Sequence, residues 1–112
     1  MKTSELSGAA LDWAVTHANY EINGEHIWGT ENCNYSTDWA LGGAIIEREG
    51  IGIWMYQWNE QGEPENGWYA EDKDGDHVRT GTTPLIAAMR CYVASKLGDE
   101  IEIPKELCHA SN

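Results

Sequence analysis

Apolar side chains recur at helical spacing near the carboxyl-terminal end of the sequence, between residues 82 and 100. The positions that follow one another at intervals of three and four residues are Ile86, Met89, Val93 and Leu97. Residues at these intervals share one face of a helix, and Leu85, Ala88 and Tyr92 widen that face until few positions are left for water. The pattern predicts an apolar helix that forms the central packing element of a small domain.

The predicted helix has recognisable signals at both ends. Thr82 or Thr83 can cap its first free N–H groups. Pro84 fits the first helical position, where a missing N–H costs nothing. Gly98 supplies the left-handed residue that commonly follows a helix, so we expect the helix to end there.

A second helix is predicted near the amino terminus, in the stretch GAALDWAVTHA at residues 8–18. Ser7 is a candidate N-cap, and Leu6 and Leu11 have the spacing of a hydrophobic staple. The side chains expected on the buried side are Leu11, Ala14, Val15 and Ala18.

Alternating apolar and polar positions predict strands between the two helices. Residues 20–32 are expected to form a hairpin, because Asn-Gly at positions 23 and 24 is the strongest short hairpin signal. Residues 44–58 are expected to include a strand covered on both faces, since apolar positions 51, 53 and 55 alternate with aromatic positions 54, 56 and 58. A polar turn at 59–67 and a further strand at 67–73 follow.

The last part of the chain completes the predicted order of elements. After a turn at residues 74–76, the stretch HVRTG leads into the main helix, and Ile101 and Ile103 indicate one short strand behind it. The order helix, strands, helix, strand predicts an α+β fold, an antiparallel sheet of about four to six strands with two main helices packed on it. We expect residues 1–112 to form a single domain, with 105–112 as a frayed tail.

Residues 33–43, CNYSTDWALGG, fit neither the helical nor the alternating pattern and are predicted to form a loop. Short polar residues and glycines surround two large aromatic residues in it, Tyr35 and Trp39. Loops of this composition often carry function, because open backbone and short side chains can approach a ligand.

The composition narrows the classes of partner. A formal net charge of −12 over 112 residues argues against binding to duplex nucleic acid, which requires basic residues. The same charge favours solubility or a basic partner protein. No apolar run approaches the roughly 20 residues of a membrane helix, and the first residues lack the apolar core of a signal peptide. We therefore expect neither duplex nucleic acid nor a membrane as a partner.

The three cysteines, Cys33, Cys91 and Cys108, form no close pair and no metal-type spacing. An odd number of cysteines suits a reducing cytosol better than a secreted scaffold. Cys91 lies among apolar positions of the predicted helix, so we expect it to be a buried free thiol.

Three blocks of the sequence resemble a known family. LSGAALDWAV, YSTDWALGGAIIEREGI and GTTPLIAAMRCYVASKLGDEIEIP, which together make up about half of the chain, are similar to the NinX-like proteins, whose genes lie in the accessory nin region of lambdoid phages. Ala44 stands where the family tends to have proline. The resemblance implies a phage origin and expression in the host bacterial cytoplasm, and it implies no particular activity.

Common catalytic and metal-binding motifs do not occur in the sequence, which has no HExxH, GxSxG or GxxxxGK. The acidic run at 71–76 does not lead to a Glu at the twelfth position of a calcium loop, so we interpret it as a solvated turn. His17 and His26 are interpreted as surface or core-edge residues. We therefore expect no enzyme, no metal site and no cofactor.

The groups needed to bind a nucleotide-like ligand are present in two segments. Such a ligand needs aromatic faces for its base, short polar groups for ribose hydroxyls, and N–H groups or arginine for phosphate. Tyr35 and Trp39 are the candidates for stacking, and Ser36, Thr37 and Asp38 are the candidates for hydroxyl contacts. Close backbone approach is assigned to Gly42 and Gly43, and anion contacts to Arg48, Arg79, Thr82 and Thr83.

Each candidate also has a purely structural interpretation. Trp39 can belong to the core, Thr83 can serve only as a helix cap, and Arg48 can pair with a neighbouring glutamate on the surface. The clustering of the candidates is what favours a ligand site.

Two functions are consistent with these observations. The leading hypothesis is a counter-defence protein that sequesters a small nucleotide-derived immune messenger without cleaving it, since accessory phage proteins often oppose host defence. The rival is an acidic module or DNA mimic that blocks a host nucleic-acid-binding protein. Such a mimic needs its carboxylates in rows on one exposed face. Seven of the nineteen carboxylates lie between Glu60 and Asp76, and the scatter of the others along the chain favours the first hypothesis. Spare apolar surface leads us to expect a homo-oligomer.

Overall fold

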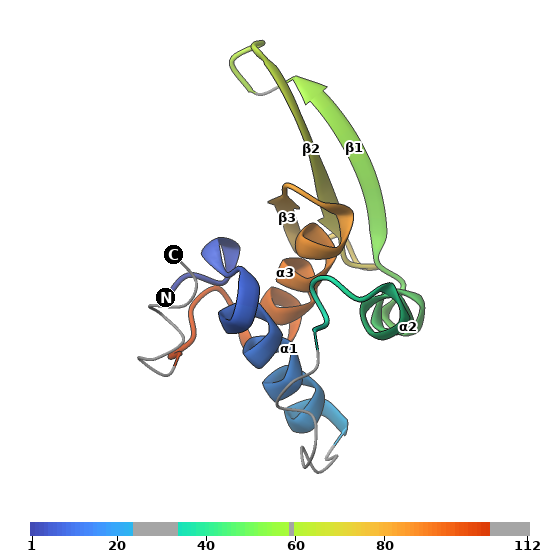
Figure 1. Ribbon diagram of the computed structural model, residues 1–112, viewed down its shortest axis with the longest axis vertical. Coiled ribbons are helices and arrows are strands. Elements are labelled where there is room, and N and C mark those ends of the chain that lie inside the picture. The colour runs from blue at the N-terminus through green and yellow to red at the C-terminus, as the bar shows by residue number, and fades with distance from the viewer. Residues whose placement is uncertain (24–33, 59, 104–112) are drawn as a thin grey trace.

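The structure is a computed structural model in which residues 1–23, 34–58 and 60–103 are described. The described part contains three α-helices, one turn of 3-10 helix and a three-stranded antiparallel sheet (Figure 1). In chain order the elements are η1 (Thr3–Glu5), α1 (Gly8–Asn23), α2 (Trp39–Glu49), β1 (Gly52–Trp58), β2 (Pro64–Glu71), β3 (Val78–Gly81) and α3 (Pro84–Leu97). The α+β class is confirmed.

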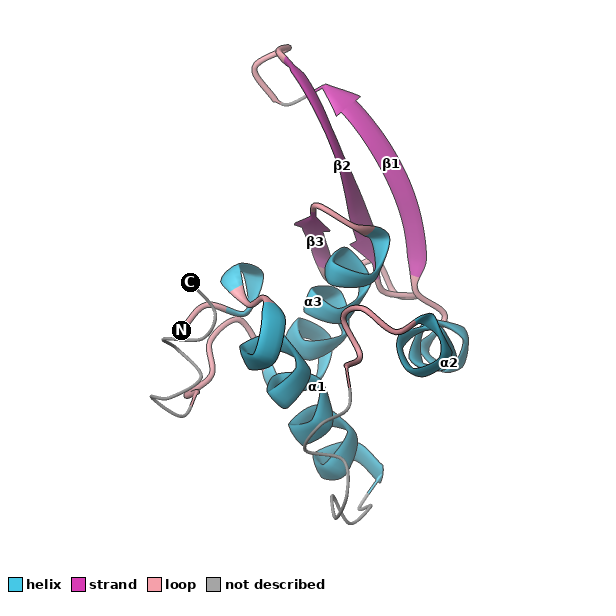
Figure 2. Cartoon of the chain, in the orientation of Figure 1, coloured by secondary structure: helices cyan, strands magenta, loops and turns pink. Residues whose placement is uncertain are grey.

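Helix α3 is the central element, as its apolar pattern predicts. It packs against α1, α2, η1 and all three strands, and Figure 2 shows it between α1 and α2. The Thr83 hydroxyl accepts a hydrogen bond from the Ile86 N–H at 3.1 Å, so Thr83 is the N-cap. Gly98 follows the helix with a positive φ of 90°, which a residue with a side chain rarely adopts.

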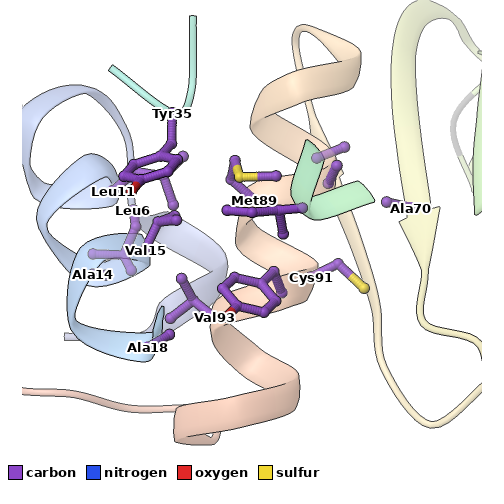
Figure 3. Close-up of a cluster of buried hydrophobic side chains, with 14 of the residues drawn as sticks. Leu6, Leu11, Ala14, Val15, Ala18, Tyr35, Ala70, Met89, Cys91 and Val93 are labelled. Atoms are coloured by element: carbon purple, nitrogen blue, oxygen red, sulfur yellow. The ribbon is translucent and has the colours of Figure 1, made fainter. Parts of the chain in front are cut away.

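The hydrophobic core lies on both sides of α3 (Figure 3). The four α1 side chains predicted to be buried, Leu11, Ala14, Val15 and Ala18, have no exposed surface. Val93 of α3 faces this side in Figure 3, whereas Cys91 points toward the sheet. The prediction that Cys91 is a buried free thiol is confirmed.

The two ends of the described chain lie side by side. The Thr3 N–H donates to the Asp99 carbonyl at 2.8 Å, and the Ile101 N–H donates to the Met1 carbonyl at 3.0 Å. Among the described residues one isolated β-bridge forms here, between Lys2 and Glu100, rather than the short strand predicted over residues 100–104, the last of which lies outside the described residues. The predicted frayed tail at 105–112 lies outside the described residues.

The sheet has the strand order β1-β2-β3 with antiparallel neighbours. The described residues therefore form three strands, and the predicted number of four to six is wrong. The β1–β2 hairpin extends beyond the helices in Figure 1. Because it leaves the body of the molecule, Trp54, Met55 and Trp58 are about half exposed, and the prediction that both faces of this strand are covered is also wrong.

Two segments that the sequence predicted as strand or loop are helical. Residues 20–23 continue α1. An Asn-Gly pair is typical of a helix end as well as of a hairpin turn. The remainder of the predicted hairpin, including His26, lies outside the described residues. Residues 39–49 form α2 instead of a loop and the start of a strand. The Asp38 side chain caps α2 by accepting from the Ala40 N–H at 2.9 Å, and Gly50 ends it with a left-handed φ of 67°.

Candidate functional site

A hollow of about 220 Å³ separates the turn before α2 from the first turn of α3. The residues that line it are Ser36, Thr37, Trp39, Thr83, Pro84, Leu85 and Ile86. The two segments that the sequence singled out therefore meet in space. The segment that leads into α2, residues 34–38, passes beside α3, as Figure 1 shows.

Hydrogen bonds hold the turn at residues 34–38 against the helical body. The Ser36 N–H donates to a carboxylate oxygen of Asp12, in α1, at 2.8 Å. The N–H groups of Thr37 and Asp38 both donate to the Asn34 carbonyl, at 3.1 and 2.8 Å. With Tyr35 and Ser36 buried, the turn is fixed by local bonds and by packing, which gives the hollow a defined wall.

Gly42 explains how closely α2 approaches the rest of the protein. A Cβ atom built on Gly42 would lie 2.5 Å from the Tyr35 carbonyl oxygen and 2.6 Å from Cδ2 of Leu85. Only glycine fits this contact. Gly43 is different, because the nearest atom to its added Cβ is a Trp39 ring carbon at 3.7 Å. Both glycines serve the packing of α2, and neither lines the hollow.

Trp39 is the largest side chain of the hollow. It is the first residue of α2 and 55% of it is exposed, so the alternative that it belongs to the core is wrong. Thr83 has two roles, since it caps α3 and also lines the hollow. Helices α2 and α3 thus both begin at this place, and helix N-termini carry partial positive charge that favours anions.

Arg48 lies away from the hollow, in the last turn of α2. Its guanidinium forms an ion pair with Glu49 at 2.9 Å and donates to the Tyr92 hydroxyl at 3.0 Å. The alternative that Arg48 pairs with a neighbouring glutamate is therefore confirmed. Burial raises the pKa of the Tyr92 hydroxyl to about 12, so the hydroxyl stays protonated. It continues the network by donating a hydrogen bond to Asn19 at 2.7 Å.

Four other predicted residues are also outside the hollow. Arg79 donates to the Asp99 carboxylate at 2.6 Å and to the Val78 carbonyl at 2.8 Å. Asp38 caps α2, Thr82 is exposed without lining the hollow, and Tyr35 packs in the core. Neither of the two arginines predicted to contact an anion lines the hollow.

The sequence did not single out Pro84, Leu85 and Ile86 as lining residues. Leu85 and Ile86 belong to the apolar pattern of α3, which predicts burial in the core. The signal that distinguishes them is their position directly after the helix cap, where side chains border the open end of a helix. The hollow is consequently more apolar than the predicted site.

Within the described ranges, no group of three or more His, Cys, Asp or Glu side chains is arranged to hold a metal ion. Of the acidic run at 71–76, which was predicted to be a turn, Glu71 is the last residue of β2 and residues 72–76 lie in the turn between β2 and β3. None of the helices described is long and apolar enough to cross a membrane.

Comparison with known proteins gives one family. The family model described as Bacteriophage P22, NinX matches residues 2–96, a range that includes the whole hollow and every element of the described fold except the last residue of α3. No curated protein matches the chain.

Proposed function

The chain belongs to the NinX family of phage proteins, and on that premise we propose that it binds and sequesters a small nucleotide-derived ligand without cleaving it. The observation that carries this proposal is the hollow in which an exposed tryptophan, Trp39, stands where two helices begin. A base stacks on the indole face, and a phosphate is attracted by the N-terminus of α3.

The size of the hollow limits what one copy can enclose. Its volume of about 220 Å³ is below the roughly 300–1,000 Å³ of typical small-molecule pockets. One copy therefore covers only part of a nucleotide-sized ligand. We propose that a second copy covers the rest, which agrees with the expected homo-oligomer.

The lining of the hollow supports binding rather than catalysis. Its seven residues include hydroxyl, apolar and indole side chains, and no carboxylate, imidazole, thiol or amine. General acid–base catalysis needs one of these groups within hydrogen-bonding distance of the ligand. Sequestration needs none, because it acts by lowering the free concentration of the messenger. In a phage protein this activity serves counter-defence in the host cytoplasm.

The distribution of carboxylates favours this proposal over the acidic module or DNA mimic. Glu60, Glu63 and Glu65 lie at the far end of the β1–β2 hairpin, whereas Asp72 to Asp76 lie at its base. About seven residues of strand at roughly 3.3 Å each put about 20 Å between the two groups. A mimic of DNA requires a continuous row of charge, and these groups do not form one.

The experiment is isothermal titration calorimetry against a panel of cyclic and ADP-ribose-derived nucleotides. We expect a member of the panel to bind. We expect Trp39→Ala to lower its affinity by roughly 5- to 150-fold, the equivalent of about 1–3 kcal/mol for one stacked base. Trp54→Ala is the matched control, because Trp54 is similarly exposed but lies on the sheet.

Mass spectrometry of the ligand released by heating tests the second half of the proposal. An intact ligand is expected. Failure of every nucleotide in the panel to bind contradicts the proposal, and so does release of a hydrolysed product.

A further inference from the structure

The sheet has an outer face that no helix covers in the described structure. Gly81 of β3 contacts Ile86 and Ala87 of α3, and Ala70 of β2 is fully buried, so these residues mark the helix-facing side. Side chains alternate between the faces of a strand. Tyr69 and Thr80, which are partners in the β2–β3 register, therefore point away from the helices.

A cleft of about 480 Å³ lies on this outer face, near the end of the β1–β2 hairpin. Its aromatic walls are Tyr56, Trp58 and Tyr69, and its polar rim includes Glu60, Gln61 and Glu65. It is about twice as large as the hollow at α3 and shares no residue with it. The two sites are therefore independent.

Contacts on the sheet hold the aromatic rings in place. The Tyr56 ring crosses to the neighbouring strand and lies over Gly67, where a Cβ atom would overlap it. The Trp54 ring stacks on the Tyr69 ring with centroids 5.3 Å apart and an interplanar angle of 19°. Rings fixed in this way present preformed π faces, whose negative quadrupole attracts cations.

The charges around the cleft have one sign. Glu60 and Glu65 contribute carboxylates, and none of the described residues that line the cleft is a lysine, arginine or histidine. Glu65 and Tyr56 line the cleft together, and desolvation together with the charge and hydrogen bond of Glu65 raises the pKa of the Tyr56 hydroxyl. In a chain with a net charge of −12, phosphate groups are repelled from this place and cations are attracted.

We propose that this outer-face cleft is a docking site for an arginine side chain in a basic segment of a partner protein. A planar guanidinium stacks on aromatic rings and forms bidentate hydrogen bonds with a carboxylate, and a lysine ammonium does neither as well. A nucleic acid carries the wrong charge. A second copy of the chain would bring its own carboxylates against Glu60 and Glu65, which is unfavourable.

The test is an NMR titration of the full chain with a short Gly/Arg peptide, together with a peptide in which citrulline replaces each arginine. Citrulline keeps the shape and removes the charge. We expect the arginine peptide to shift the Trp58 indole and the Tyr69 amide signals, a lysine peptide to bind about twofold to fivefold more weakly, and the citrulline peptide to cause no shift. Added salt is expected to weaken binding.

Matched substitutions locate the site. Glu65→Gln is expected to weaken the arginine peptide by about twofold to fivefold, whereas Glu63→Gln, which removes the same charge from the same hairpin end outside the cleft, leaves binding unchanged. In the same way, Trp58→Ala is expected to weaken binding of the arginine peptide, whereas Met55→Ala, which changes a similarly exposed side chain of β1, leaves binding unchanged.

Three results would overturn the proposal. Equal binding of the arginine and citrulline peptides excludes recognition of charge. Equal effects of the two glutamine substitutions show attraction to the overall charge and not to the cleft. Shifts of the outer-face signals on dilution, without peptide binding, show that a second copy occupies the face.

Discussion

Two neighbouring glycines of α2 differ in the space around them, although the sequence pattern assigns them the same role. A Cβ on Gly42 would lie 2.5 Å from the Tyr35 carbonyl oxygen, whereas the nearest atom to a Cβ on Gly43 is 3.7 Å away. We predict that Gly42→Ala destabilises the protein by about 1–3 kcal/mol through overpacking. Gly43→Ala should stabilise it by about 0.5–1 kcal/mol, because alanine is the better helix former.

Urea unfolding of the two variants measures both free energies of unfolding. Because Gly42 sets the approach of α2 to Leu85, Gly42→Ala should also change the hollow that Leu85 and Trp39 line. A Gly42→Ala variant as stable as Gly43→Ala would show that α2 moves away from α3 without cost.

At the same scale, the sequence predicted part of the candidate site. Ser36, Thr37, Trp39 and Thr83 meet in the hollow as expected, because local polar and aromatic residues indicate where a loop stands next to a helix start. The sequence alone does not show that Arg48 and Arg79 lie outside the hollow. Arg48 pairs with the adjacent Glu49, which the sequence did suggest. Its bond to Tyr92 and the bond of Arg79 to Asp99 join residues 44 and 20 positions apart, and such tertiary pairings leave no local pattern.

At the scale of elements, the turn between β2 and β3 depends on one carboxylate. Asp72 accepts from the Asp76 N–H at 2.8 Å and contacts the His77 ring nitrogen Nδ1 at 2.8 Å. Desolvation raises the pKa of Asp72, but the hydrogen bonds from His77 and from the Asp76 amide outweigh it and lower the pKa below its usual value. The charged form is therefore favoured in the folded state.

A lowered pKa makes the contribution of Asp72 dependent on pH. The stabilisation is present above the unfolded-state pKa, about 4, and is lost as the pH falls through the lower folded-state value. We predict that Asp72→Asn is less stable than the wild type at pH 6 and that the difference disappears in acid. Urea unfolding between pH 2 and 7 measures it, and Asp74→Asn removes the same charge from the same turn. Equal pH profiles of the two variants would contradict the prediction.

The elements with strong end signals are also the ones that the sequence predicted well. α3 begins and ends where Thr83 and Gly98 indicate, and the buried face of α1 is correct. α2 was missed because its adjacent glycines are typical of loops, although Gly42 is there for close packing. The surplus of predicted strands came from the hairpin assigned to residues 20–32, of which residues 20–23 continue α1, and from the short strand expected behind the main helix, where only an isolated bridge forms.

At the scale of the whole molecule, the β1–β2 hairpin projects from a helical body (Figure 1), and β1 is an edge strand of the sheet. Natural edge strands usually carry charges, proline or bulges that prevent pairing with another chain. Gly52–Trp58 contains no charged residue and no proline, and its register is irregular only between Tyr56 and Trp58. An uncharged edge is also where two copies with a net charge of −12 each repel each other least.

We therefore predict that two copies associate by antiparallel pairing of their β1 strands. Met55→Lys should give monomers, because a charge on an edge strand opposes such pairing, while Val78→Lys on β3 should leave the assembly intact. Met55 and Val78 are 55% and 47% exposed, so the two substitutions are matched in exposure. Size-exclusion chromatography with light scattering over a range of concentrations measures the mass. Because we propose that a second copy completes the ligand site, Met55→Lys should also weaken binding of the nucleotide-derived ligand. A wild type that remains monomeric at high concentration would contradict both the pairing and the shared enclosure of the ligand.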